Sequence, residues 1–447
     1  ITSLKEANEI KSRCEHAEGI VEDIERKMYR RRRPPPFNLS SLQAEAYRLF
    51  GFSPSKTQAI AERLYLEALI SYPRTSSQKL PPSIGYEEIL RSLQAIPAYN
   101  DLAKEILRKS SLKPIQGRRD DPAHPAIHPT GNLPSRILER DEEKIYDLIV
   151  RRFLSCFSDD LIKENLRLTI RLNDGDLFNV VGSRVLSEGW LKFYPYSSIT
   201  TYELPKIEKG TKVTVNEIYV YEKLTQAKPR FNPGSLLKFM ERNNLGTKST
   251  RAEIIDTLYQ RGYIQGERIV VTELGFTIVN ALKRLFPDML SIKLTRELEE
   301  KMDNVEKGES PPKEVMLEVL ENLRQVFEKA IYKSEGLGLR LLKSVKDARY
   351  SRKVIGKCPA CGIGDLIIIY SKKSGKRFIG CSRYAQGCRL GLPLPQKGVI
   401  QATGLTCKSC GYPIIRVKGL SPRPWHLCVN PKCPSKTRAK LMEDNGV

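Results

Sequence analysis

Eight cysteines near one end of the chain restrict its possible folds more than any other feature of the sequence. They form two sets of four, each beginning with a Cys-x2-Cys pair: Cys358, Cys361, Cys381 and Cys388, then Cys407, Cys410, Cys428 and Cys433. A two-residue spacing lets both thiolates of a pair face one tetrahedral Zn²⁺. Each set therefore predicts a zinc ribbon, which a structural metal folds because the module is too small to hold a core. We expect these ribbons over residues 354–395 and 403–440.

Aromatic and basic side chains accompany both cysteine sets. Phe378, Tyr384 and Trp425 lie close to the cysteines, among Lys and Arg residues. Exposed aromatic rings stack on unpaired bases, and neighbouring cations neutralise phosphates. We interpret these three residues as contacts for single-stranded DNA, while a purely structural role for the zinc modules stays open.

The charge balance indicates the same class of partner. The 447 residues include 75 Lys or Arg and 52 Asp or Glu, a net charge of +23 that is typical of proteins that bind polyanions. No run of 18 apolar residues predicts a membrane span, and the N-terminus does not resemble a signal peptide. We therefore expect a cytoplasmic, nucleoid-associated protein. In that compartment clustered cysteines favour metal over disulfides, and we interpret the two separate cysteines, Cys14 and Cys156, as buried.

Helical signals are strong after Phe37. Ser40 with Gln43 predicts a capping box, and Ser53 with Pro54 predicts the start of a second helix, which we expect to continue to about Leu69. Two helices joined by a short glycine turn resemble a helix-turn-helix.

Strand signals follow, and then helices return. Alternation predicts strands at 166–172, 178–181 and 211–221, with a turn at 173–176. Residues 228–345 then predict helix, turn, helix and hairpin, the order of a winged helix. Leu294, Leu298, Met302 and Val305 recur at helical spacing, which predicts a core stripe.

These patterns predict a multidomain α+β chain. Its expected parts are an initial hinge or arch segment over 1–36, a helical domain with the helix-turn-helix over 37–164, a β-rich arch over 165–226, a winged-helix-like domain over 227–345, and the two zinc ribbons.

A tyrosine at the expected helix exit is the candidate nucleophile. Pro73 forces the backbone out of the helix directly after Tyr72, and Arg74 follows. A phenol has an ordinary pKa of about 10, so it attacks poorly unless nearby positive charge favours the phenolate. Arg74 supplies such charge and can stabilise a phosphoryl group that gains negative charge. The alternative is that Tyr72 only packs against its neighbours, which is the more common role of a tyrosine.

The segment Leu69 to Thr75 resembles the active-site segment of the type IA DNA topoisomerases. Further blocks resemble the same family in the same order, at residues 34–43, 121–130, 230–237, 246–264 and 272–275, and the zinc modules fit. The resemblance implies an ATP-independent transesterase that relaxes negative supercoils or decatenates DNA. Tyr72 would join the 5′-phosphate of a single strand and release a 3′-hydroxyl, which reseals the break after strand passage. It also makes residues 37–164 the gate domain. The Ser-Tyr-Pro-Arg form leans towards topoisomerase III and archaeal members.

The resemblance also assigns residues around the nucleophile. By position, His124 matches the family histidine that hydrogen-bonds the scissile phosphate; Pro125 and Pro129 disfavour metal ligation with His128, and a structural loop stays open. DNA contacts are implied at seven further positions, where helix caps and solvated side chains are the alternatives: Thr75, Arg118, Arg119, Lys248, Ser249, Thr250 and Arg251. No nucleotide is expected, because Gly246 to Thr250 lacks the P-loop pattern.

One departure from the family concerns Mg²⁺. Members carry an N-terminal Toprim domain whose acidic cluster binds this ion, and the sequence lacks an Asp-x-Asp-x-Glu pattern: Asp174 and Asp176 have no third acid beside them. We expect the family torus without Toprim, with Mg²⁺ bound through the missing part or through a separate Toprim-containing chain, and a monomer on single-stranded or negatively supercoiled DNA.

The alternatives are a non-catalytic zinc-ribbon protein that binds single-stranded DNA, and a rolling-circle tyrosine nuclease. The nuclease needs a His-x-His pair that this sequence lacks. Reverse gyrase fits less well, because its helicase half is missing and its zinc modules lie elsewhere.

Overall fold

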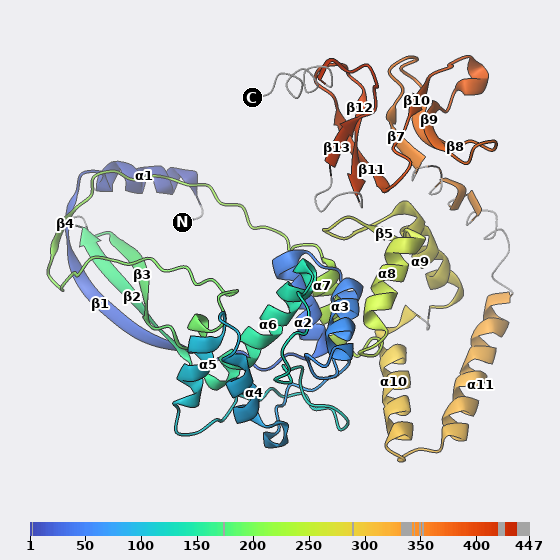
Figure 1. Cartoon of the computed structure of the whole chain (residues 1–447). Helices are drawn as coiled ribbons and strands as arrows, with labels where there is room; N and C mark the ends of the chain where they lie inside the picture. The colour runs from blue at the N-terminus through green and yellow to red at the C-terminus, as the bar shows by residue number, and fades with distance from the viewer. Residues whose placement is uncertain are drawn as a thin grey trace, which may run out of the picture. The chain divides into compact units, whose positions relative to one another are not determined.

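The computed structural model describes residues 1, 3–172, 175–287, 290–331, 342–343, 345–347, 350, 353–418 and 425–435. These residues form two compact units. The first unit comprises Ile1–Val271 with Asp288–Glu321, and the second comprises Thr272–Pro287 with Asn322–Val447. Figure 1 traces the chain through both units.

Helices and strands are mixed in the first unit. Its helices are α1 (Leu4–Cys14), α2 (Leu39–Phe50), α3 (Pro54–Leu66), α4 (Tyr86–Leu93), α5 (Asn100–Leu107), α6 (Arg140–Phe157), α7 (Pro233–Arg242), α8 (Arg251–Arg261) and α10 (Ile292–Glu306), with 3-10 turns η1 (Pro82–Ile84) and η2 (Gly189–Lys192). Its strands are β1 (Glu18–Arg31), β2 (Leu161–Leu172), β3 (Leu177–Ser187), β4 (Lys212–Thr214), β5 (Ile264–Gln265) and β6 (Val270–Val271). Helix α11 (Pro312–Ile331) begins in this unit.

One antiparallel sheet has the strand order β3-β2-β1-β4. β1 pairs with β2 from Gly19 opposite Leu172 to Arg31 opposite Leu161, so the N-terminal segment joins strands more than a hundred residues later (Figure 1). The strands predicted at 166–172 and 178–181 are confirmed and are longer than expected. Residues 173–174 of the predicted turn lie outside the described residues.

The strand predicted at 211–221 is wrong beyond residue 214. β4 pairs only with the first three residues of β1, where Thr214 lies opposite Glu18. Just before that point His16 has a left-handed φ of 64°, and the chain leads back into α1. The sheet edge ends there, so the β-rich pattern of residues 215–221 has no strand to pair with.

A large apolar core holds helices α2 to α6 together. Ile145, Leu148 and Ile149 of α6 are fully buried, and residues from the connecting loops, including Phe37 and Ile127, join the same cluster. Burial of this many large side chains makes the helical part of the first unit a rigid support for the loops that it carries.

The helix boundaries around the glycine turn differ in detail from the prediction. The capping box of α2 is formed by Asn38 and Ser41 instead of the predicted Ser40 and Gln43. The side-chain amide of Gln43 is buried and donates to Pro54 O over 3.1 Å. Ser53 caps α3 and Pro54 opens it, as expected. α3 ends at Leu66 instead of Leu69, because Ala68 has a left-handed φ of 56° that ends the helical repeat.

The predicted order of helix, turn, helix and hairpin is found at α7, α8, β5 and β6. Asn232 and Ser235 form a capping box at the start of α7, with Pro233 as its first residue. α7 also packs along α2, where a side chain at Gly234 would meet Tyr47 at 3.3 Å.

The core stripe predicted on α10 is wrong. None of the α10 residues that the structure describes is buried, and the side chain of Met302 is 62% exposed. Helical spacing predicts an apolar face, but it does not supply an element that covers that face.

The second unit contains α9 (Glu273–Leu285), the end of α11 and two sheets. The first sheet has the order β10-β9-β8-β7 and the second β11-β12-β13. Their strands are β7 (Val354–Lys357), β8 (Asp365–Tyr370), β9 (Arg377–Cys381), β10 (Gly391–Pro393), β11 (Val399–Thr406), β12 (Pro413–Lys418) and β13 (Trp425–Cys428). Ile355, Leu366 and Ile379 from the first sheet and Ile415 and Val417 from the second share one core.

No described helix is long and apolar enough to cross a membrane.

Candidate active site

Tyr72 lies on an irregular segment that two buried residues anchor. Leu69 and Ile70 are each 1% exposed and pack into the main core. Residues 68–71 then run antiparallel to residues 126–130, with Ile70 bridged to Pro129. The Ser71 N–H donates to His128 O over 2.9 Å, and the Thr130 N–H donates to Leu69 O over 3.2 Å. The segment is therefore held from both sides without being part of a helix or sheet.

The half-buried phenol ring of Tyr72 contacts two other rings. Its centroid lies 4.6 Å from that of His124 and 5.2 Å from that of Tyr65. Among the described residues, no hydrogen-bond partner is found for the Tyr72 hydroxyl. The geometry thus fixes the plane of the ring and leaves its oxygen available to a substrate.

Arg74 is paired with an acid of α3. Its Nε donates to Glu62 Oε1 over 2.7 Å, and its Nη2 lies 2.5 Å from the same oxygen. Gln58 also donates to this oxygen, over 3.0 Å. The sequence predicted a cation beside Tyr72, and the structure adds an acid, Glu62, that orients the Arg74 guanidinium.

The two histidines of the 124–130 segment lie in different environments. The half-exposed ring of His124 packs against Tyr72 at an interplanar angle of 54°, while His128 is 6% exposed and its Nδ1 lies 2.8 Å from Ala126 O. Burial lowers the pKa of His128, and the bond to Ala126 opposes this shift only in part. Among the described residues, neither histidine belongs to a group of three close potential metal ligands.

Thr75 is 1% exposed, and its partners are all within the protein. Its hydroxyl donates to His124 O over 3.2 Å and accepts the Ser77 N–H over 3.0 Å. Its carbonyl accepts the Leu39 N–H over 3.1 Å. These contacts give Thr75 a supporting position under the segments of Tyr72 and His124.

Asp121 connects the same segments to the turn before α8. Its carboxylate accepts the Ser76 N–H and hydroxyl, each over 3.0 Å, and the Ala123 N–H over 3.2 Å. Lys248 Nζ lies 2.5 Å from its Oδ2. Burial alone would raise the pKa of Asp121, but the Lys248 ammonium and these hydrogen bonds hold it well below its usual range.

Some of the other predicted DNA contacts are exposed, and others already have partners within the protein. Arg118 is exposed, whereas Arg119 pairs with Glu241 over 2.7 Å. Thr250 Oγ1 accepts the Thr247 N–H over 2.9 Å, and Arg251 donates from Nε to Leu245 O over 3.1 Å. Burial, its largest influence, lowers the pKa of Arg251.

A polar groove of about 400 Å³ lies between α3 and α8. Arg74, Glu62 and Ser249 are among the residues that line it. The groove thus brings Arg74, two residues after Tyr72, close to Ser249 in the turn before α8.

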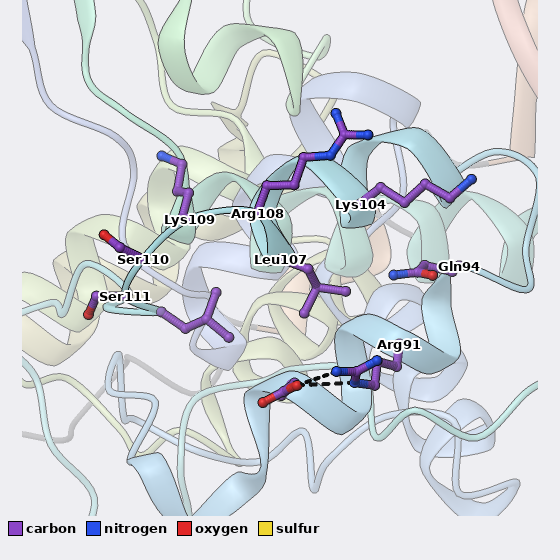
Figure 2. A pocket seen from close by; sticks show the side chains of 10 residues that line it. Arg91, Gln94, Lys104, Leu107, Arg108, Lys109, Ser110 and Ser111 are labelled. Carbon is purple, nitrogen blue, oxygen red and sulfur yellow. Dashed lines mark hydrogen bonds and ion pairs between the residues drawn. The ribbon is translucent and has the colours of Figure 1, made fainter.

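A second pocket of about 420 Å³ lies on α4 and α5 and contains none of the predicted site residues. Figure 2 shows its lining, with Lys104, Arg108 and Lys109 on the α5 side and Arg91 bound to a carboxylate on the α4 side. That carboxylate belongs to Glu87.

Each set of four cysteines is brought together in the second unit. The four sulfur atoms of a set all lie within 4.8 Å of one another. Facing pairs are 3.8 Å apart for Cys358 and Cys388, 3.7 Å for Cys361 and Cys381, 3.6 Å for Cys407 and Cys433, and 3.4 Å for Cys410 and Cys428. A tetrahedral ion with Zn–S bonds of about 2.3 Å needs sulfur atoms about 3.8 Å apart. Both sets are thus consistent with zinc sites.

The three predicted aromatic contacts lie around these clusters. Phe378 is on β9 opposite Ile369, and Trp425 begins β13 and is 37% exposed. Tyr384 is 56% exposed, and the Arg389 guanidinium lies 4.4 Å from its ring centre. All three rings are at least partly accessible to a ligand.

Comparison with known proteins identifies the family of the chain. A family model described as DNA topoisomerase matches residues 1–317. The chain belongs to the type IA DNA topoisomerase family. The matched residues make up most of the chain, so the family resemblance found in the sequence is confirmed.

Two curated relatives of this topoisomerase chain come from archaea. It is 41% identical to DNA topoisomerase 1 of Pyrococcus horikoshii over 92% of its own length and 60% of that protein. It is 40% identical to DNA topoisomerase 1 of Methanothermobacter thermautotrophicus over 96% of its length and 57% of that protein. The chain therefore spans a little under two thirds of the length of these relatives.

A solved structure shares the mixed helix and sheet architecture of this topoisomerase chain. Full-length topoisomerase I from Thermotoga maritima matches with a TM-score of 0.58 at 25% identity, over 90% of this chain and 63% of that one.

Two residues of the candidate site were missed from sequence. Glu62 and Asp121 are the partners of Arg74 and Lys248, but neither stands in a motif that marks it among the 52 acidic residues. Asp121 lies inside the block that resembles the family, which was the one available signal.

Proposed function

We propose that this chain provides the DNA-cleaving tyrosine of a type IA topoisomerase, which breaks, passes and rejoins single-stranded DNA without ATP. The observation that carries this proposal is the grouping of Tyr72, His124 and Arg74 on two paired segments over a rigid core. In a member of the type IA family, that grouping supports relaxation of negative supercoils or decatenation as the activity of the longer protein.

The proposed reaction is a transesterification. The Tyr72 oxygen attacks a backbone phosphorus, an O–P bond forms, and the bond from phosphorus to the 3′-oxygen breaks. The phenol loses a proton and the leaving 3′-oxygen gains one, so the step needs no net proton. Attack by the 3′-hydroxyl on the phosphotyrosine reverses these changes, so the bond energy is kept and no nucleotide is consumed.

His124 and Arg74 would act on the phosphate. The His124 ring lies against Tyr72, so one of its nitrogens can donate to a phosphoryl oxygen of a strand that reaches the phenol. Arg74 would share its guanidinium between Glu62 and the phosphate, and a fixed guanidinium stabilises developing negative charge without reorganisation. Arg118, Lys248, Ser249 and Thr250 would contact the strand nearby, with Arg119, Arg251 and Thr75 supporting them.

We assign the parts of the chain by the same family plan. Residues 37–164 would be the gate domain, 1–36 and 165–226 the hinge and arch, and 227–345 a winged-helix-like domain. The antiparallel sheet formed by β1 to β4 and the order of α7, α8, β5 and β6 support these assignments.

The two cysteine clusters would bind structural Zn²⁺, the first at residues 354–395 and the second at 403–440. Bound zinc supplies folding energy to a small module. The first segment contains seven Lys or Arg and one Asp, and the second contains eight Lys or Arg and no acid. This charge, with Phe378, Tyr384 and Trp425, supports contact with single-stranded DNA.

Magnesium has no assigned ligands in this chain. Among the described residues, the groups of at least three potential ligands that lie close together are the two cysteine clusters, so we derive no step through Mg²⁺. The greater length of the relatives supports the proposal that a Toprim portion binds it, either in the same protein or in a separate chain. We propose a monomer that associates with DNA in the nucleoid.

Covalent capture of DNA tests this function. An end-labelled single-stranded oligonucleotide is incubated with Mg²⁺ and three proteins: this chain, a longer protein extended upstream to the length of the relatives, and the longer protein with Tyr72→Phe. We expect a 5′-linked adduct only with the extended wild type. An adduct in the phenylalanine variant would remove Tyr72 from its role, and no adduct in any form would favour a non-catalytic zinc-ribbon DNA-binding protein.

A further inference from the structure

The Asp121 carboxylate accepts hydrogen bonds from three separate segments. Ser76, four residues after Tyr72, donates both its N–H and its hydroxyl to Oδ2, and Ala123, the residue before His124, donates its N–H to Oδ1. The third segment is the turn before α8, whose Lys248 lies 2.5 Å from Oδ2. One carboxylate thus touches the backbone beside both residues of the proposed reaction.

We infer that Asp121 is a positioning residue for strand cleavage, and that a DNA phosphate replaces it as the partner of Lys248. The inference rests on the proposed function, in which Tyr72 attacks and His124 contacts the phosphate. Asp121 itself does not touch the reacting atoms, because it acts through the backbone of Ser76 and Ala123 and through the Lys248 side chain.

Because Asp121 is buried, its hydrogen bonds help to hold the segments of Tyr72 and His124 in place. Its side chain is 3% exposed, so water competes weakly for its hydrogen bonds. The Ser76 and Ala123 N–H groups bond to different oxygens, so replacing one oxygen by the NH2 group of asparagine leaves one of them without its acceptor. The segments of Tyr72 and His124 would then keep only their other contacts, such as the Ser71 and Thr130 pairing and the bond from the Thr75 hydroxyl to His124 O, which leaves the phenol and the imidazole less well aligned.

The exposure of Lys248 allows the exchange of partners. Its side chain is 37% exposed while that of Asp121 is buried, so a phosphate can approach Nζ from the solvent side. After the exchange, Asp121 still accepts three hydrogen bonds from neutral donors, which is enough to keep a buried carboxylate ionised. Binding of the strand therefore leaves no unsatisfied charge behind.

A matched carboxylate elsewhere separates positioning from general stability. Asp160 has a side chain that is 10% exposed, accepts the Arg33 N–H over 3.0 Å and pairs with Arg30 over 2.6 Å. Like Asp121, it accepts a backbone N–H and pairs with a cation, but these partners lie near the end of β1 and just after it, and not on the segments of Tyr72 and His124. Asp160→Asn is therefore the control for Asp121→Asn.

Amide hydrogen exchange of this chain tests the backbone contacts. Asp121→Asn is expected to speed exchange about tenfold in the peptide that contains Ser76, in the one that contains Ala123, or in both. Lys248→Met and Asp160→Asn should leave those peptides unchanged, because the Asp121 acceptor remains in both. Equal exchange in wild type and Asp121→Asn would overturn the positioning role.

A double-mutant cycle tests the exchange of partners, with a fluorescent single-stranded oligonucleotide as the probe. Asp121→Asn frees Lys248 and should tighten binding about two- to tenfold, whereas in the Lys248→Met background the same change should have no effect. Equal effects in both backgrounds would mean that Asp121 acts only by general repulsion, and would overturn the exchange.

The cleavage readout keeps this inference distinct from the proposed function. In the extended protein, Asp121→Asn should lower kcat for adduct formation without raising KM, whereas Asp160→Asn should change neither. If wild type forms the adduct and both variants match it, the inference fails while the function stands. If no protein forms the adduct, the hydrogen-exchange and oligonucleotide-binding results still decide the role of Asp121.

Discussion

Arg74 donates to Glu62 through both Nε and Nη2, at 2.7 and 2.5 Å, two residues after the proposed nucleophile. Glu62 lies on α3, and Gln58 donates to the same carboxylate oxygen. The cation beside Tyr72 is thus held in a fixed orientation before any substrate arrives. A fixed guanidinium stabilises a transition state at little entropic cost, but its charge must be shared with an acid.

Replacing Glu62 should therefore separate orientation from charge. In the extended protein, Glu62→Gln is expected to slow adduct formation about tenfold, because Arg74 loses its fixed orientation. Affinity for a single-stranded oligonucleotide should stay equal or increase slightly, since one negative charge is removed. Single-turnover cleavage and fluorescence anisotropy measure the two effects. Glu67→Gln is the control, because Glu67 follows the same helix and pairs with Arg136. A slower rate in both variants would exclude a specific role for Glu62.

Substitution of His124 should affect chemistry more than binding. His124→Ala is expected to lower the rate of adduct formation about a hundredfold, because a donor to the phosphoryl oxygen is lost. His124→Asn, which keeps an N–H donor, should recover part of that rate. Tyr65→Phe is the control, since it keeps the other ring that contacts Tyr72. If His124→Ala and Tyr65→Phe lower the rate equally, ring packing and not hydrogen bonding explains the effect.

His128 should make the stability of the first unit depend on pH. Burial lowers the pKa of His128 in the folded state, so the unfolded chain binds a proton more readily. The free energy of unfolding is then highest above the ordinary histidine pKa of about 6.5, and falls as pH decreases below that value. In His128→Asn this part of the pH dependence should disappear. Urea midpoints between pH 5 and 8 measure it.

The exposed His16 provides the matched control for that measurement. Its left-handed φ of 64° is one that asparagine tolerates, so His16→Asn should fold normally. A pH profile altered equally by both substitutions would show that the effect does not come from burial of His128.

Removal of metal should unfold both zinc modules together. Ile355 and Leu366 of the first sheet and Ile415 and Val417 of the second belong to one core, so loss of one metal site weakens the packing of the other. We expect about two zinc ions per chain, and Cys407→Ser with Cys410→Ser should lower the melting temperature of both modules. Cys156→Ala, at a buried cysteine outside the clusters, should leave the zinc content unchanged. An intact first module in the double variant would show that the two fold independently.

The features that the sequence predicted well depend on short spacings. Two cysteines separated by two residues lie side by side in nearly any compact turn, and this is why both clusters were predicted correctly. The capping pattern of Ser53 with Pro54 is equally local. The α2 cap was misplaced by two residues because Asn38, Ser40 and Ser41 are all residues of the capping type.

Features that require a distant partner were predicted less well. The strand predicted at 211–221 stops at residue 214, because its partner β1 begins only at Glu18, just after α1 ends. The apolar stripe of α10 is not buried in the described structure. In both cases the local pattern is a real preference, and the outcome was decided by the position of another segment.

The sequence by itself determined the chemistry that this protein carries: a tyrosine beside a proline and an arginine, two sets of four thiols, and an excess of positive charge. These depend on residue type and near neighbours. The tertiary structure alone decided that Tyr72 faces His124, that Arg74 pairs with Glu62, and that Asp121 pairs with Lys248 127 residues away. With 75 basic and 52 acidic residues, countless pairings have similar local energies, and only the packing of the core selects among them.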